Sequence, residues 1–184
     1  MIWIWRVPEK WADKRIGNCV KNTGTDRFEY QKAIILNEEN TTCPNIIFEC
    51  EEKYLFDVLP NSGSLLVVSR KVLDILKCFC PEDFQVFEAN VYAKDKKITG
   101  YYLLNLLVSL NVVDKENSAF KTMKNSNAIL KFDKIVYNVE NILDFDIIRN
   151  SDYLSHVLVS TRLKEAFEKE KIKGVEFRDA TIVT

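Results

Sequence analysis

Two segments of the chain repeat one pattern, and this repeat constrains the fold more than any other feature of the sequence. Each has a short apolar run, then Val-Ser, then a charged amphipathic stretch: LVVSRKVLDIL around Ser69 and LVSTRLKEAF around Ser160. A serine hydroxyl can accept hydrogen bonds from the backbone N–H groups of a first helical turn, so each serine is expected to cap a helix. The repeat therefore predicts two units in which a strand leads into a serine-capped helix.

Apolar residues recur at helical spacing after each serine, as expected of a helix that packs one stripe on a sheet. Pro81 limits the first helix, and Gly174 is expected to end the second as a C-terminal cap glycine. A return strand is expected after each helix. The repeat fits either a duplication or one common structural solution used twice, and we favour coincidence or weak pseudo-symmetry over duplication. The core-facing positions are Val72, Leu73, Leu76 and Phe79 after Ser69, and Leu163, Ala166 and Phe167 after Ser160.

Other apolar stretches predict the remaining strands. Residues 2–6 read Ile-Trp-Ile-Trp-Arg, which predicts a first strand with Trp3 and Trp5 on one face. We expect a single α+β domain with a largely antiparallel sheet and two main helices, in which residues 1–56 form a strand-rich segment packed on a body of residues 57–184. Further strands are expected within 33–37, 45–50, 84–93, 100–113, 129–139, 144–150 and 175–183, with a hairpin turn at 94–97 and a loop at 114–128.

Charge and hydropathy exclude several classes of protein. The net charge of −1 argues against a broad phosphate-binding surface, so no nucleic acid is expected as a partner. The longest apolar stretch is broken by Asn105, Ser109 and Asn111, which argues against a membrane span. The opening MIWIWRVPEKW is too short for a secretory signal. We therefore expect a cytoplasmic protein that does not bind a membrane.

The cysteines are odd in number, and a chain of this length does not need disulfides. We interpret them as small buried hydrophobic residues of a reducing compartment. A metal site built from four of them is a weaker alternative, because Cys78-Phe-Cys80 lacks the spacing of a zinc knuckle. No metal and no cofactor is therefore expected. The five are Cys19, Cys43, Cys50, Cys78 and Cys80.

Candidate catalytic residues are few. His156 is the only histidine, and the glycines form no phosphate-binding motif. Asp144 and Asp146 would share one face of a strand, where they could bind a divalent cation or exchange a proton. The competing interpretation places Phe145 in the core and both carboxylates in water. We favour the latter, and no catalytic residue is expected.

An acidic stretch is the clearest candidate binding surface. Residues 37–60 contain six acidic residues and a single basic residue, Lys53. Such a surface could attract a basic partner and speed its encounter, although it also fits an ordinary solvated edge. Trp3, Trp5 and Trp11 are possible interface anchors, but core positions are the more common role for tryptophan. The residues that we expect to contact a partner are Glu38, Glu39, Glu49, Glu51 and Glu52.

From Asp57 to Phe177 the order of pieces resembles a known family. The pieces are DVLPNSGSLLVVSRKVLDIL, YYLLNLLVSLNVVDKENS, DFDIIRN, VLVSTRL and KGVEF. They resemble the bacterial immunity proteins of polymorphic toxin systems, in immunity protein family eleven, formerly a domain of unknown function. Ile148 stands where the family often has phenylalanine, which is a change of core packing. The matching residues, read as fold-determining, are Val68, Ser69, Tyr101, Tyr102, Leu104, Asn105, Asp114, Ser118, Arg149, Val159, Ser160 and Gly174.

The resemblance implies a non-enzymatic protein that binds a toxin encoded beside it and so protects the cell that makes both. It supplies no catalytic residues. Two rival functions remain open: a small metal-dependent hydrolase using Asp144, Asp146 and His156, and an adaptor domain with no toxin partner. The sequence does not indicate the oligomeric state.

Overall fold

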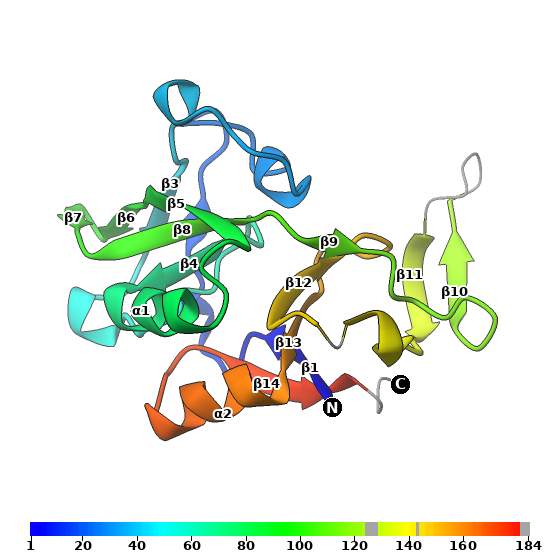
Figure 1. Cartoon of the computed structure of the whole chain (residues 1–184). Helices are drawn as coiled ribbons and strands as arrows, with labels where there is room; N and C mark the ends of the chain where they lie inside the picture. The colour runs from blue at the N-terminus through cyan, green and yellow to red at the C-terminus, as the bar shows by residue number, and fades with distance from the viewer. Residues whose placement is uncertain (124–128, 143, 181–184) are drawn as a thin grey trace.

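The computed structural model describes residues 1–123, 129–142 and 144–180 (Figure 1). This part of the chain holds two α-helices, α1 (Arg70–Phe79) and α2 (Thr161–Lys169), and strands arranged in four sheets. Most strand pairs are antiparallel, and the expected α+β class is confirmed. The strands are β1 (Ile2–Arg6), β2 (Asn18–Cys19), β3 (Asn45–Phe48), β4 (Leu66–Ser69), β5 (Phe84–Glu88), β6 (Asn90–Ala93), β7 (Lys96–Ile98), β8 (Tyr101–Leu106), β9 (Ser109–Leu110), β10 (Ala119–Thr122), β11 (Ile129–Lys134), β12 (Ile147–Asn150), β13 (Val157–Ser160) and β14 (Glu176–Asp179).

Both repeated segments build the same strand–helix–strand unit with a third strand inserted in the middle. In the first unit, β4, α1 and β5 follow one another, and β8 lies between β4 and β5, antiparallel to both. In the second unit, β13, α2 and β14 follow one another, and β1 takes the middle place in the same way. Each is a split βαβ arrangement. We call them the first unit (β4, α1, β5 and β8) and the second unit (β13, α2, β14 and β1).

The serine caps are confirmed in both units. The Ser69 hydroxyl accepts a hydrogen bond from the Val72 N–H (3.5 Å), and the Ser160 hydroxyl accepts one from the Leu163 N–H (3.1 Å). Each bond satisfies a backbone donor that has no partner inside the helix.

The role expected of Gly174 is wrong. The helix α2 ends at Lys169, with Glu170 as its cap residue. Gly174 lies beyond, at φ +94°, where a Cβ would collide with the carbonyl oxygen of Val58. Two backbone segments meet here without room for a side chain, so the position requires glycine. This contact joins the second unit to the segment before β4.

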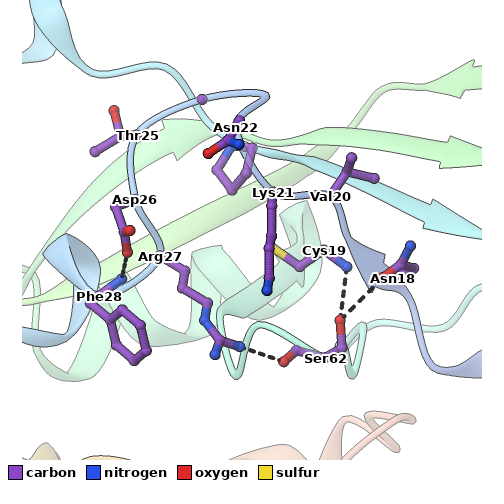
Figure 2. A pocket seen from close by; sticks show the side chains of 12 residues that line it. Asn18, Cys19, Val20, Lys21, Asn22, Thr25, Asp26, Arg27, Phe28 and Ser62 are labelled. Atoms are coloured by element: carbon purple, nitrogen blue, oxygen red, sulfur yellow. Dashed lines mark hydrogen bonds between the residues drawn. The ribbon is translucent and has the colours of Figure 1, made fainter.

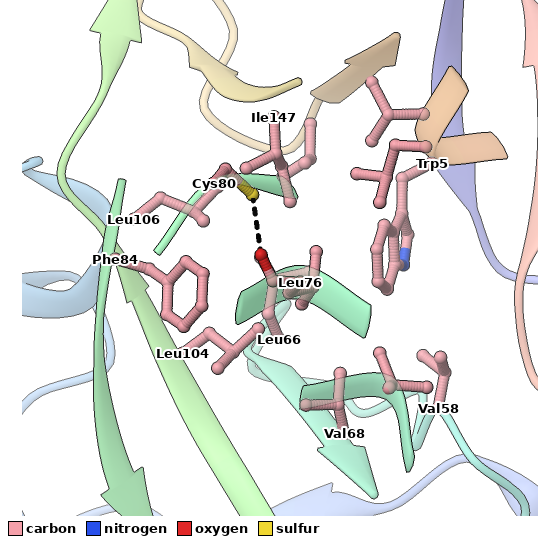
Figure 3. Packing of buried hydrophobic residues seen from close by; sticks show 14 of the residues in the cluster. Trp5, Val58, Leu66, Val68, Leu76, Cys80, Phe84, Leu104, Leu106 and Ile147 are labelled. Carbon is pink, nitrogen blue, oxygen red and sulfur yellow. Dashed lines mark hydrogen bonds between the residues drawn. The ribbon is translucent and has the colours of Figure 1, made fainter. Parts of the chain in front are cut away.

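The main hydrophobic core lies between the two units and contains both helices (Figure 3). The two helices contact each other, and corresponding positions supply both sides of this core. Trp5 of β1 contacts Phe167 and Phe177 edge to face, with ring centroids 5.4 and 6.0 Å apart. Corresponding residues are Val58 and Ile147, Leu66 and Val157, Val68 and Val159, Val72 and Leu163, Leu76 and Phe167, and Leu104 and Trp5.

Each unit is also buried on its other sheet face. Val67 of β4 packs in a second core against the sheet of β2, β3, β6 and β7. Leu158 of β13 and Ile4 of β1 pack in a third core together with Ile148 and Tyr137. Burial on both faces explains why β4 and β13 read as unbroken apolar runs.

Three expectations for strands need correction. Residues 33–37 form no strand, because side-chain amides replace a partner strand: Gln85 bonds both the N–H and the carbonyl of Leu36, and Asn105 donates to the Ile34 carbonyl. The expected loop at 114–128 contains β10, which pairs with β11 through the Phe120–Phe132 contact; residues 124–128 lie outside the described part. The hairpin expected around residues 94–97 forms, but Lys96 and Lys97 belong to β7 and not to the turn, and the expected arms, 84–93 and 100–113, each divide between two sheets.

No helix in the described ranges is both long enough and apolar enough to cross a membrane.

Candidate functional site

The five glutamates of the acidic stretch are exposed, but they form two groups. Glu38 and Glu39 lie on a short 3-10 turn before β3, whereas Glu49, Glu51 and Glu52 follow that strand. In Figure 1 the turns at residues 38–40 and 52–54 lie at opposite ends of β3. A partner would have to extend along β3 to contact both groups.

Lysines neutralise part of this stretch, and two of them, Lys94 and Lys96, are distant from it in sequence. Lys94 and Lys53 pair with Glu51 at 3.9 and 2.9 Å, and Lys96 pairs with Glu52 at 2.6 Å. All these side chains are more than half exposed, so the pairs add little to stability. Within the described residues Glu38, Glu39 and Glu49 form no ion pair, and they carry the uncompensated charge.

A basic and aromatic cluster lies beside the second acidic group, and the sequence reasoning missed it. The Arg15 guanidinium lies over the rings of Trp11, Tyr54 and Phe56, at 5.7, 5.6 and 5.1 Å from their centroids. Tryptophan, tyrosine and arginine are the residue types most common at binding hot spots. The signal in the sequence was weak, because these residues come from two segments that only the fold brings together.

The three tryptophans divide between core and surface. Trp5 is buried in the main core and Trp3 packs against that core from the same face of β1, as expected for alternating residues of a strand. Trp11 is half-buried, and its indole N–H donates to the Arg15 carbonyl at 3.0 Å. Of the three, Trp11 remains a candidate interface anchor.

A hollow of about 740 Å³ lies in the loop after β2 (Figure 2). Ser62 closes one side: its hydroxyl accepts from the Cys19 N–H (3.0 Å), and its carbonyl accepts from Arg27 (2.8 Å). Lys21 and Arg27 contribute positive charge, and Phe28 leaves about half of its surface exposed (52%). The hollow offers donors and one exposed ring, and its described lining includes no histidine and no paired carboxylates.

The proposed catalytic residues do not form one site. Asp144 is exposed, whereas Asp146 is 2% exposed and accepts hydrogen bonds from the Ser160 hydroxyl and from Arg162. Both aspartates precede β12, and the expectation that both carboxylates face water is wrong for Asp146. His156 lies at the opposite end of β13 from Ser160, roughly 13 Å away at about 3.3 Å per residue.

His156 has its own partners. Its Nδ1 lies 2.6 Å from the Tyr137 hydroxyl, and the Tyr153 ring packs edge-on against the imidazole at 4.7 Å. Burial, and to a smaller extent the nearby Arg6, lower the pKa of His156 to about 4. The imidazole is therefore neutral at neutral pH and belongs to a packed polar network of the third core.

The cysteines are all free and do not assemble a metal site. Cys43, Cys50 and Cys80 are buried, and burial raises the pKa of Cys80 to about 12. Cys19 is half-buried and Cys78 is exposed, so the expectation of burial is wrong for Cys78. Among the residues that the structure describes, no group of three or more histidine, cysteine or acidic side chains could hold a metal ion.

Comparison with known proteins gives one family. The family model described as "Immunity protein family (Imm11)" matches residues 12–181, and no curated protein matches the chain. The match begins well before Asp57, where the resemblance in the sequence begins, so it includes most of the N-terminal segment. It covers both serine-capped helices and all but the first strand of the fold. The chain belongs to the Imm11 immunity protein family.

Proposed function

We propose that this protein binds a cognate toxin and neutralises it by stoichiometric association, without chemistry of its own. Membership of an immunity protein family, over residues 12–181, is the observation that carries the proposal. The toxin would be encoded nearby, and the two proteins would meet in the cytoplasm. An interface that buries roughly 1,600 Å² in total, with a well-packed centre, is enough for such binding.

The positions of the polar residues favour binding over hydrolysis. Asp146 is engaged by Ser160 and Arg162, and His156 is engaged by Tyr137 at the other end of β13. A hydrolase built from Asp144, Asp146 and His156 would need these residues to converge on one substrate. Their separation gives the hydrolase alternative no support.

We propose the exposed glutamates Glu38, Glu39, Glu49, Glu51 and Glu52 as toxin contacts. Glu38, Glu39 and Glu49 have no ion pair in the described structure, so their charge is available to a basic partner. Long-range attraction of this kind raises the association rate and falls with added salt. Glu51 and Glu52 would exchange their lysine partners for groups of the toxin.

Co-expression with the neighbouring toxin, followed by co-purification and calorimetry, tests the function. We expect a one-to-one complex and protection of the host cell. If toxin and protein do not associate and the host is not protected, the immunity function is wrong and the adaptor interpretation is left.

Charge reversal tests the surface. Replacing Glu38, Glu39 and Glu49 with lysine should weaken binding by about ten-fold or more and reduce its dependence on salt. A matched variant with lysine at the exposed Glu82, Glu116 and Glu165 changes the net charge equally and should bind within about two-fold of the native protein. Equal affinities of the two variants would eliminate the acidic surface as a contact.

A further inference from the structure

A buried arginine without a carboxylate partner lies in the second unit's sheet. Arg149 belongs to β12, whose residues are all buried, and its own side chain is 2% exposed. One of its donors is used: Nη1 donates to the Leu154 carbonyl at 2.6 Å. Its Nε has no hydrogen-bond partner among the described residues. The Nε is enclosed by protein atoms, and Nη2 forms no hydrogen bond among the described residues, so two of the guanidinium nitrogens have no partner.

The charge on Arg149 makes this arrangement costly. Burial lowers the pKa of Arg149 to about 10, so the guanidinium is still charged at neutral pH. A buried charge without a counter-ion destabilises a fold, and buried charges are normally paired. Asp146, at the start of the same strand, illustrates the usual solution, since Arg162 provides its counter-ion. Arg149 forms no ion pair within the described residues.

Arg149 is one of the residues that line a cavity of about 290 Å³. Apolar side chains of the main core form its walls, among them Trp5, Val58 and Leu66, which Figure 3 displays from the core side. The exposed residues Arg6 and Ser155 lie at its rim, so the cavity can be entered from solvent. Gly174 completes the wall where the two units meet.

The shape and chemistry of this cavity suit a carboxylate. The side-on edge of a guanidinium donates two parallel hydrogen bonds, which match the two oxygens of a carboxylate. The apolar walls suit the short aliphatic stem that carries such a group. A phosphate would need more donors than one buried guanidinium and one arginine at the rim. His156 lines the same cavity but is neutral, so it supplies no further positive charge.

We propose that this cavity is a carboxylate-binding site, in which the charged guanidinium of Arg149 binds the carboxylate through donors that have no partner in the fold, and Trp5, Val58 and Leu66 enclose the stem. The carboxylate comes either from an acidic side chain of the bound toxin or from a small free acid. The first source rests on the proposed function, whereas the existence of the site does not.

The test uses sodium propionate as the probe, on the full chain labelled with ¹⁵N. The Arg149 Nε–H signal should move saturably, with a dissociation constant on the order of 1–10 mM for so small a ligand. Propionamide has the same size without the charge and should leave the signal unchanged, as should sodium chloride at equal ionic strength. No saturable shift with propionate, an equal response to propionamide, or tighter binding of inorganic phosphate would overturn the site.

Two further measurements sharpen the result. Arg149→Lys keeps the charge but removes the planar guanidinium together with its Nε–H signal, so propionate binding is followed in both proteins at the indole N–H of Trp5, which lines the cavity. The variant should bind propionate at least ten-fold more weakly. Propionate binding of native strength in this variant would overturn the role of Arg149. The comparison of propionate with propionamide needs no variant, so it stands even if Arg149→Lys fails to fold.

With the toxin bound, loss of the propionate response places a toxin carboxylate in the cavity, whereas an unchanged response assigns the site to a free acid. Absence of a toxin complex would defeat the proposed function alone.

Discussion

The first and second units are built alike, but they obtain their middle strands from different parts of the chain. In the first unit β8 follows β5 after the short β6–β7 hairpin, so the whole unit lies within residues 66–106. In the second unit the middle strand is β1, which is separated from β13 by most of the chain. The first unit can therefore form from neighbouring residues, whereas the second is complete only when the two ends of the chain meet.

The two units also differ in how an aspartate supports the capping serine. Asp57 and Asp146 occupy corresponding places, since each accepts from the hydroxyl of its serine and also offers its carbonyl to the serine N–H. Asp146 completes its bonding within its own unit, through Arg162. Asp57 instead accepts from the Lys173 N–H at 3.0 Å, which belongs to the other unit. The first unit's aspartate thus joins the two units, and the second unit's aspartate fixes its own helix.

Removal of β1 should have the largest effect on this comparison. Deleting residues 1–6 leaves β13 and β14 without a strand between them and removes Ile4 and Trp5 from two cores. We expect loss of the cooperative unfolding transition, measured by circular dichroism during urea denaturation. The milder change Ile4→Ala should cost about 2–4 kcal/mol, and Val7→Ala, at an exposed position, less than about 0.5 kcal/mol. A truncated chain with the native midpoint would show that the second unit does not depend on β1.

The pH dependence of stability should come from the second unit. His156 precedes β13 as Leu65 precedes β4, and Leu65 is a buried leucine. Burial lowers the pKa of His156 to about 4, whereas the unfolded chain takes up this proton near pH 6.5. The contribution of His156 is therefore fully present above pH 6.5 and is lost as the pH falls toward 4, by up to about 3 kcal/mol.

The variant His156→Gln isolates this effect, because glutamine keeps a polar group beside Tyr137 while removing the titration. His156 contacts Tyr137 and Tyr153 and lies near Arg6, and Asp133, Lys134 and Arg178 line a pocket beside it; all of these groups are the same in both proteins. Urea unfolding of both proteins is measured from pH 7 to pH 4. The free energy of unfolding of the native protein should fall more steeply with decreasing pH than that of His156→Gln. Parallel curves would mean that the pKa of His156 is the same in the fold as in the unfolded chain.

Replacements of the two aspartates should differ in the stability they remove and in their coupling to Arg162. Asp146→Asn should cost about 2–3 kcal/mol, because it removes charge-assisted hydrogen bonds to a buried carboxylate, and Asp57→Asn about 1–2 kcal/mol. Combined with Arg162→Ala, the Asp146 change should be non-additive by more than about 0.5 kcal/mol, whereas the Asp57 change should add. Thermal denaturation of the five variants measures this. Coupling of Asp57 with Arg162 would contradict the separate roles of the two carboxylates.

Local features of the sequence predicted the elements of both units, whereas contacts between distant segments set their assembly. Ser69 and Ser160 were found because a cap and its helix are neighbours in sequence. The middle strand β1 was expected as a strand, but nothing local assigned it to β13 and β14. Residues 33–37 read as a strand because Ile34 and Ile35 are β-branched, yet both are exposed in the structure, and side chains of Gln85 and Asn105 hold that backbone.

The same limit applies to the candidate sites. The acidic stretch consists of residues that are close together in the sequence. Its partners Lys94 and Lys96, in the β6–β7 hairpin, lie about forty residues further along, so a local count of charge does not include them. Arg149 was noted only through the family resemblance, as a fold-determining residue. Its burial and its missing counter-ion depend on the packing of β12 against β13, which no local pattern reports.

The capping serines should give the smallest difference between the units. The Ser160 hydroxyl lies closer than that of Ser69 both to its helix N–H (3.1 against 3.5 Å) and to its aspartate (2.6 against 3.3 Å). Ser160→Ala should therefore cost about 1–2 kcal/mol and Ser69→Ala about 0.5–1 kcal/mol, both measured by urea denaturation. Ser155→Ala, at an exposed serine, is the control and should change stability by less than about 0.5 kcal/mol. Each serine links a strand, a helix and an aspartate. A larger loss of stability at Ser160 would therefore mean that the second unit, whose middle strand comes from the far end of the chain, depends more on its cap. Equal costs at the two serines would mean that the caps contribute alike to the stability of the two units.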